Sequence, residues 1–74
     1  MITTKDITPG FTFKATNTIY EVLKVHNANI VDLLNLTTNN TFLFNIKPIV
    51  DGINKGIYYI EPRVVKPLTY IEEL

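Results

Sequence analysis

The chain has 74 residues, of which seven are basic and seven acidic, so that its formal net charge is zero. This length predicts one domain, spanning residues 1–74, with a single small hydrophobic core, and the absence of cysteine excludes disulfides and fits a reducing compartment. Balanced charge, scattered along the chain, argues against a nucleic-acid binder that uses a basic stripe.

The N-terminal segment carries no targeting signal that the sequence reveals. Residues 1–6 lack an apolar signal-peptide core, and no apolar run approaches the roughly 18 residues that span a bilayer. We therefore expect a soluble cytoplasmic protein that contacts no membrane. Pro9 and Gly10 then predict a turn, because Pro presets φ and Gly accepts a positive φ. Residues 11–14 follow as a short first strand.

Three apolar runs, residues 19–25, 30–36 and 41–44, are rich in β-branched and aromatic residues. Two Asn-rich joins separate them, and Asn suits hairpin loops because it tolerates positive φ and bonds its own backbone. We predict two antiparallel hairpins. If both loops have four residues, Val25 lies opposite Ile30 and Leu36 lies opposite Thr41.

This register assigns the side chains to two faces, because strand side chains alternate with a period of two. The core face is mainly aromatic and β-branched, with two polar residues near strand ends: Tyr20, Val22, Val31, Leu33, Phe42 and Phe44, with Lys24 and Asn35. The other face mixes large apolar groups with two carboxylates that would be costly to bury unpaired: Ile19, Glu21, Leu23, Val25, Ile30, Asp32, Leu34, Leu36 and Leu43.

After Phe44 the apolar period changes to that of a helix. Ile46, Ile49, Val50 and Ile53 are spaced i, i+3, i+4 and i+7. We expect a short helix that is capped by Asn45, ended by Gly56 and weakened by Gly52. Residues 57–61 predict a last strand, in which one of Tyr58 and Tyr59 enters the core and the other is an interface candidate. For residues 63–74, an extension of the sheet at Val64 and Val65 and a capping box at residues 69–72 are both open.

The expected fold is mainly β, a small five-stranded barrel with a short helix before the last strand. The pattern Pro9-Gly10-x-Thr12-Phe13, then Tyr20-x-Val22, then Val31-x-Leu33-x-Asn35 resembles that of small SH3-like β-barrel proteins, many of them encoded by phages or mobile elements. The resemblance covers residues 7–61 and rests on structural positions, so it transfers no functional residue. It implies an adaptor, an inhibitor of a host protein or a nucleic-acid binder. Trp and the acidic loop of polyproline-binding SH3 domains are missing, so polyproline recognition is not expected.

Residues for catalysis are scarce. Ser, Cys and Gln are absent, as is Trp, and no Gly-rich phosphate loop or metal-ligand spacing occurs. His26 reads as a solvated turn residue, and Glu21 and Asp32, which approach diagonally across the first hairpin, read as solvated sheet residues. We therefore expect no enzyme, no cofactor and no metal site.

The Leu-rich face carries the functional hypothesis, because exposed apolar patches often mark partner sites. We expect a protein-interaction module, in the host cytoplasm if a phage encodes it. Three alternatives stay open: cover by the helix or by residues 63–74, a homo-oligomeric structural protein, and a nucleic-acid-binding barrel that uses Lys14, Lys24, Lys55 and a tyrosine of the last strand. The predicted protein-binding residues are Leu23, Leu34, Leu36, Leu43, Glu21 and Asp32.

Overall fold

The structure is a computed structural model, which describes residues 1–62. The two predictions for residues 63–74 lie outside this part of the chain. All five predicted strands and the helix are present, with ends shifted by one or two residues. The elements are a 3-10 turn, η1 (Thr4–Asp6), β1 (Thr12–Ala15), β2 (Thr18–Val25), β3 (Ile30–Asn35), β4 (Thr41–Asn45), α1 (Ile46–Asn54) and β5 (Tyr58–Ile60).

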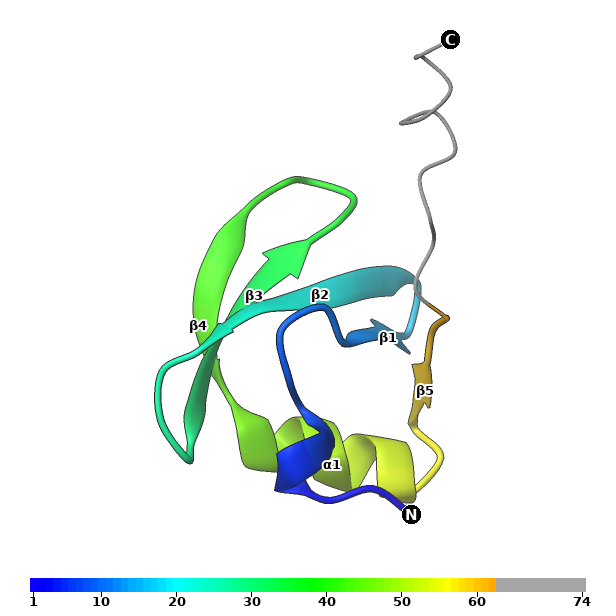
Figure 1. Cartoon of the computed structure of the whole chain (residues 1–74). Coiled ribbons are helices and arrows are strands. Elements are labelled where there is room, and N and C mark those ends of the chain that lie inside the picture. Colours follow the sequence, from blue (N-terminus) through cyan, green and yellow to red (C-terminus); the bar gives the residue numbers. More distant parts are fainter. Residues whose placement is uncertain (63–74) are drawn as a thin grey trace, which may run out of the picture.

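The five strands form one antiparallel sheet in the order β4-β3-β2-β1-β5. The sheet is strongly curved, and α1 crosses one end of it, from the base of β4 to the base of β5 (Figure 1). Within residues 1–62, β4 and β5 do not pair with each other, so the ladder of hydrogen bonds is not closed. The prediction of a mainly β fold with a short helix before the last strand is confirmed.

The predicted register of the first hairpin is half right. Glu21 pairs with Leu34 and Val22 with Leu33, as expected, but Lys24 pairs with Asp32 because a β-bulge at Leu23 shifts the register by one. With this shift His26 bonds to Ile30, and the turn begins at Asn27, whose side chain accepts hydrogen bonds from the N–H groups of Asn29 and Ile30.

The bulge moves two residues to the other face of the sheet. Val25 lies opposite Val31 and therefore shares the core side, whereas Lys24 lies opposite Asp32 on the far side. The sequence-based assignment of Lys24 to the core face and Val25 to the other face was wrong. An inserted residue reverses the alternation of side chains beyond it. In β2, even-numbered residues therefore lie on the core side before Leu23, and odd-numbered residues lie on it after Leu23.

The second hairpin is displaced by two residues from the predicted register. Thr41 lies opposite Leu34 rather than Leu36, because the turn already begins at Asn35, whose side chain accepts hydrogen bonds from the N–H groups of Thr37 and Thr38. The turn ends at Asn39, which has a positive φ of 66°. A shift of two residues keeps every side chain on its predicted face.

The core lies between the inner face of the sheet and α1. Val22, Val31 and Leu33 from the sheet are fully buried against Ile49 and its neighbours on the helix stripe, and burial of each large apolar side chain contributes about 1.5 to 3 kcal/mol. The predicted core face is confirmed except for its two ends, where Lys24 has moved and Phe42 is partly exposed. The buried apolar set is Ile7, Phe13, Val22, Val31, Leu33, Ile46, Ile49 and Val50.

Gly52 has a packing role that composition does not reveal. Its Cα faces the ring of Tyr58, and an added Cβ would overlap that ring. Tyr58, in turn, packs against the core, with its ring centroid 5.7 Å from that of Phe13. The residue that weakens the helix is therefore the one that lets β5 approach it.

We predict that Gly52→Ala destabilises the protein by about 1 to 3 kcal/mol, because overpacking against Tyr58 outweighs the gain in helix propensity. Urea denaturation monitored by circular dichroism measures the change. In a Tyr58→Ala background the same substitution should become neutral or stabilising. A stabilising effect of Gly52→Ala in the wild-type background would contradict the prediction.

Candidate protein-binding face

The six predicted binding residues lie on or beside the outer face of the sheet, which we define as the face opposite the core. Leu43 is directly opposite Asp32 on this face, and Leu34 is directly opposite Glu21. Leu43 has 62% of its surface exposed, Leu36 42% and Leu23 40%, whereas Leu34 is half-buried between its neighbours. The sheet therefore presents apolar surface where a solvated face would carry polar residues.

The irregular positions of the sheet account for the exposure of Leu23 and Leu36. Leu23 is the extra residue of the bulge, without a directly opposed partner in the register. Leu36 follows the end of β3 and is held there by a 3.0 Å hydrogen bond from its N–H to the carbonyl oxygen of Ile19. The structure thus brings all four leucines to one side of the sheet, although only Leu34 and Leu43 lie within regular ladder positions.

The two carboxylates of the outer face are in different electrostatic situations. Asp32 contacts His26 at 3.0 Å between Oδ2 and Nε2, a contact that is an ion pair when the imidazole is protonated, and it also lies opposite Lys24. His26 is therefore more than the solvated turn residue predicted for it. No ion pair to Glu21 forms within residues 1–62, so its negative charge is available to a partner.

The prediction that the helix packs on the Leu-rich face is wrong. The apolar stripe of α1 packs on the inner face, against Val22 and Leu33, and so does not reach the outer leucines. Residues 63–74, the other predicted cover, lie outside the described part of the chain.

The structure also forms an aromatic cavity that sequence analysis did not predict. It lies on the inner face, at the edge of the core, and has a volume of about 130 Å³. Ring centroids of neighbouring walls are 5.5 to 6.0 Å apart, the spacing of favourable aromatic contacts. Its lining residues are Phe13, Ala15, Tyr20, Leu33, Phe42, Phe44 and Tyr58. Their common face was predictable from alternation, but their convergence from β1, β2, β4 and β5 depends on the curvature of the sheet.

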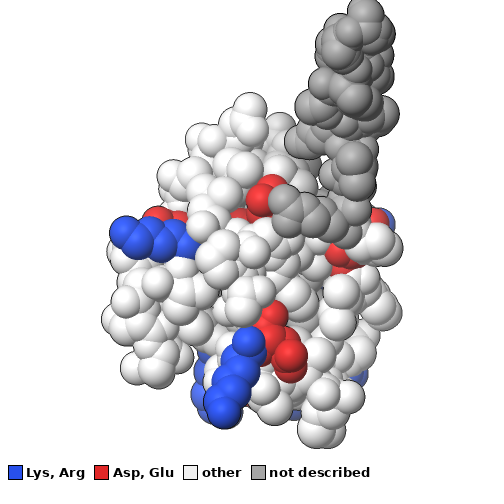
Figure 2. Space-filling view, in the orientation of Figure 1, with Lys and Arg blue, Asp and Glu red and all other residues white. Residues whose placement is uncertain are grey.

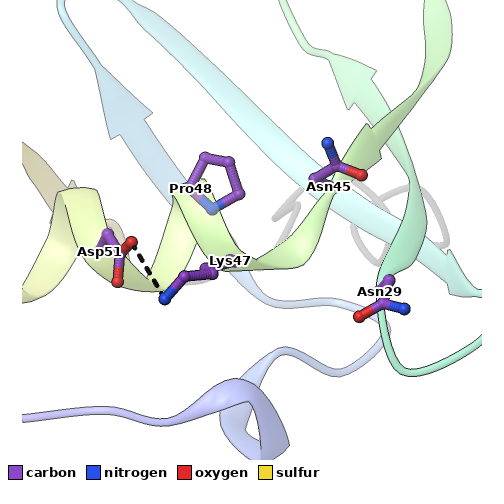
Figure 3. Close-up of a pocket in the computed structure, with 5 residues that line it drawn as sticks. All are labelled: Asn29, Asn45, Lys47, Pro48 and Asp51. Carbon is purple, nitrogen blue, oxygen red and sulfur yellow. Dashed lines mark ion pairs between the residues drawn. The ribbon is translucent and has the colours of Figure 1, made fainter.

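A second, open depression of about 490 Å³ lies at the start of α1 and is lined by Asn29, Asn45, Lys47, Pro48 and Asp51 (Figure 3). The Lys47 ammonium pairs with the Asp51 carboxylate at 3.5 Å, one helical turn away. Each charge is therefore neutralised by the other, and the depression directs no free charge toward a ligand. Asn45 begins the helix as predicted, although its side chain makes no capping hydrogen bond.

The structure brings together only part of the predicted nucleic-acid set. Lys14 lies opposite Tyr59, whose exposed fraction is 63%, whereas Tyr58 fills the core. Lys24 lies opposite an acidic residue, and Lys55 follows the end of α1. On the face shown in Figure 2, acidic and basic groups lie close to each other rather than in a field of one sign.

Residues 1–62 contain no cluster of three or more His, Cys, Asp or Glu side chains placed to hold a metal ion. Among the same residues, no helix is long and apolar enough to cross a membrane. Comparisons of the chain with protein-family models, with curated proteins and with solved structures found no match.

We predict that Asp32→Asn changes the free energy of unfolding by less than about 1 kcal/mol, because the His26–Asp32 pair is about one-third exposed and solvent screens it. Chemical denaturation at neutral pH measures the change, with Asp51→Asn as the control for a more exposed pair. A loss of several kcal/mol would mean that Asp32 supports the fold, and it would remove this carboxylate from the binding face.

Proposed function

We propose that this protein is a non-enzymatic interaction module that binds another protein through its outer face. The observation that carries the proposal is the exposure of Leu23, Leu36 and Leu43 on one side of the sheet. Apolar groups that converge in this way on a small domain are typical of the centre of a protein interface, where water is excluded on binding.

The charge at the edge of this surface specifies the partner further. Glu21 lies beside Leu34 with no ion pair among the described residues, whereas Asp32 is already partnered by His26. The matching partner surface is apolar at its centre and carries a Lys or Arg that reaches Glu21. Such a rim charge would act mainly on the rate of association and on specificity.

We also infer that the curved sheet is a small SH3-like barrel. Support comes from the strand order, in which the last strand returns to pair with the first, and from the short helix between β4 and β5. The predicted turn at Pro9 and Gly10 adds to it, since Gly10 has a φ of 95°. A phage-encoded adaptor or an inhibitor of a host protein is the role that the sequence resemblance implies for such a domain.

The test places a photo-crosslinking amino acid at position 23 in one variant and at position 57 in another. Both native residues are exposed, Leu23 to 40% and Ile57 to 61%, but only Leu23 lies at the proposed face. In cells that produce the protein, we expect position 23 alone to yield a discrete adduct with a different protein. Equal yields at both positions, or adducts from position 23 with copies of this chain alone, would contradict the proposal.

With the captured protein purified, we predict that Leu23→Asp weakens its binding by about 100-fold or more, because burial of an unpaired carboxylate opposes association. Titration calorimetry measures the affinity, and Ile57→Asp is the matched control, which should bind like the wild type. Leu23 is preferred to Leu34 because Leu34 is half-buried and its substitution would also affect the fold. Unchanged melting temperatures confirm that both variants are folded.

The alternative function, nucleic-acid binding, is favoured by one observation, the placement of Lys14 opposite the exposed Tyr59. A ring flanked by a cation suits stacking of a base beside a phosphate contact. This alternative predicts that mixed single-stranded oligonucleotides shift in an electrophoretic mobility assay at low salt and that Tyr59→Ala reduces the shift. Absence of a shift with the wild type at low salt would exclude it.

A further inference from the structure

The free edge of β4 has an ordered row of backbone groups. Along its other edge the strand pairs with β3. Two hydrogen bonds, Ile46 N–H to Asn29 O (2.8 Å) and Asn35 N–H to Asn40 O (2.9 Å), show which residue pairs of this ladder are hydrogen-bonded. Hydrogen-bonded and non-hydrogen-bonded pairs alternate in an antiparallel ladder. The backbone groups of Phe42 and Phe44 therefore bond to β3, whereas the N–H and C=O of Leu43 point away from β3, toward the free edge.

This edge lacks the features that usually prevent strand addition. The sequence of β4, Thr-Phe-Leu-Phe-Asn, has no charge and no proline, and its pairing with β3 contains no bulge. Leu43 is 62% exposed and Phe42 38%. The opposite edge differs, because β5 has three residues and Pro62 follows it closely.

The helix leaves the edge of β4 open. From the end of β4, α1 runs across the sheet toward β5, which it contacts, and so turns away from the free edge (Figure 1). Among residues 1–62, no strand lies beyond β4. An added strand therefore meets no described element of this chain in its way.

We propose that a second copy of this chain pairs with this edge, β4 against β4 and antiparallel, with a two-fold axis at Leu43. In this register Leu43 exchanges two backbone hydrogen bonds with Leu43 of the second copy. The N–H of Asn45 donates to the carbonyl oxygen of Thr41 in the other chain, since the Asn45 carbonyl is committed to the first turn of α1. The two five-stranded sheets become one.

In this register the side chains of one β4 strand are complementary to those of the second copy. On the outer face, Leu43 meets Leu43 and Thr41 meets Asn45, so that no like charges are opposed. On the inner face, Phe42 of one copy lies opposite Phe44 of the other. This extends the edge-to-face row that already joins Tyr20, Phe42 and Phe44, with centroid distances of 5.9 and 6.0 Å. A foreign strand would need to match the same pattern, whereas a second copy carries it.

The dimer uses the backbone edge of β4, whereas the partner site uses outer side chains centred on Leu23. The two share Leu43, whose backbone lies at the edge and whose side chain lies on the outer face. The two are compatible. In the dimer the outer faces of both copies become one continuous surface with two partner sites.

The test is the solution mass of the full chain by light scattering, measured from micromolar to millimolar concentration. We expect the wild type to pass from monomer to dimer. Leu43→Pro should remain monomeric, because it removes the central outward N–H while leaving the bonds to β3 intact. Leu43→Lys should weaken dimerisation by about tenfold or more, because two like charges then meet at the axis.

Matched controls separate the edge from the face. Leu23→Lys adds the same charge to the outer face on β2 and should dimerise like the wild type, while Leu43→Ala keeps the N–H and should dimerise more strongly than Leu43→Pro. Circular dichroism shows whether each variant is folded. If Leu43→Pro does not fold, Leu43→Lys is the variant that tests the proposal. A wild type that stays monomeric throughout, or a dimer lost in Leu23→Lys and retained in Leu43→Lys, overturns the proposal.

Discussion

The contact between the apolar stripe of α1 and the inner face of the sheet is the constraint on which the rest of the structure depends. Ile49 of the helix and Val22, Val31 and Leu33 of the sheet are almost completely buried, and they make up much of the core of a domain this small. Because α1 occupies the inner face, the outer leucines are left uncovered by the elements of residues 1–62. At the other end of the helix, Gly52 admits the ring of Tyr58 and so positions β5 against β1.

The bulge at Leu23 connects this core with the surface. It keeps Val22 opposite Leu33 on the inner face, and beyond Leu23 it places Lys24 beside Asp32 on the outer face, where His26 also contacts Asp32. The same irregularity leaves Leu23 exposed next to these residues. One inserted residue thus sets both the apolar and the charged character of the proposed binding face.

The two surfaces proposed for association, the apolar outer face and the unprotected edge of β4, are chemically distinct. The outer face offers leucine side chains and the carboxylate of Glu21, which in the proposed function would select a partner by shape and charge. The edge of β4 offers backbone groups flanked by Phe42 and Leu43, which select another strand. Pairing of two copies at the edge would place two partner sites on one surface, each centred on Leu23, with the two Leu43 side chains between them.

The sequence by itself determined the succession of strands and helix, the core face around Val22, Val31 and Leu33, and the presence of an apolar second face with Leu23, Leu34 and Leu43. These features follow from local periodicity, which each segment carries alone. The tertiary structure decided the bulge, the two-residue displacement of β4, the choice of Tyr58 over Tyr59 for the core and the convergence of aromatic rings into a cavity. The physical reason is that these features depend on which of several possible contacts form together. The turns at Asn27 and Asn35 begin where the Asn side chains bond the following backbone, and the choice of Tyr58 depends on its fit against Gly52 and Phe13.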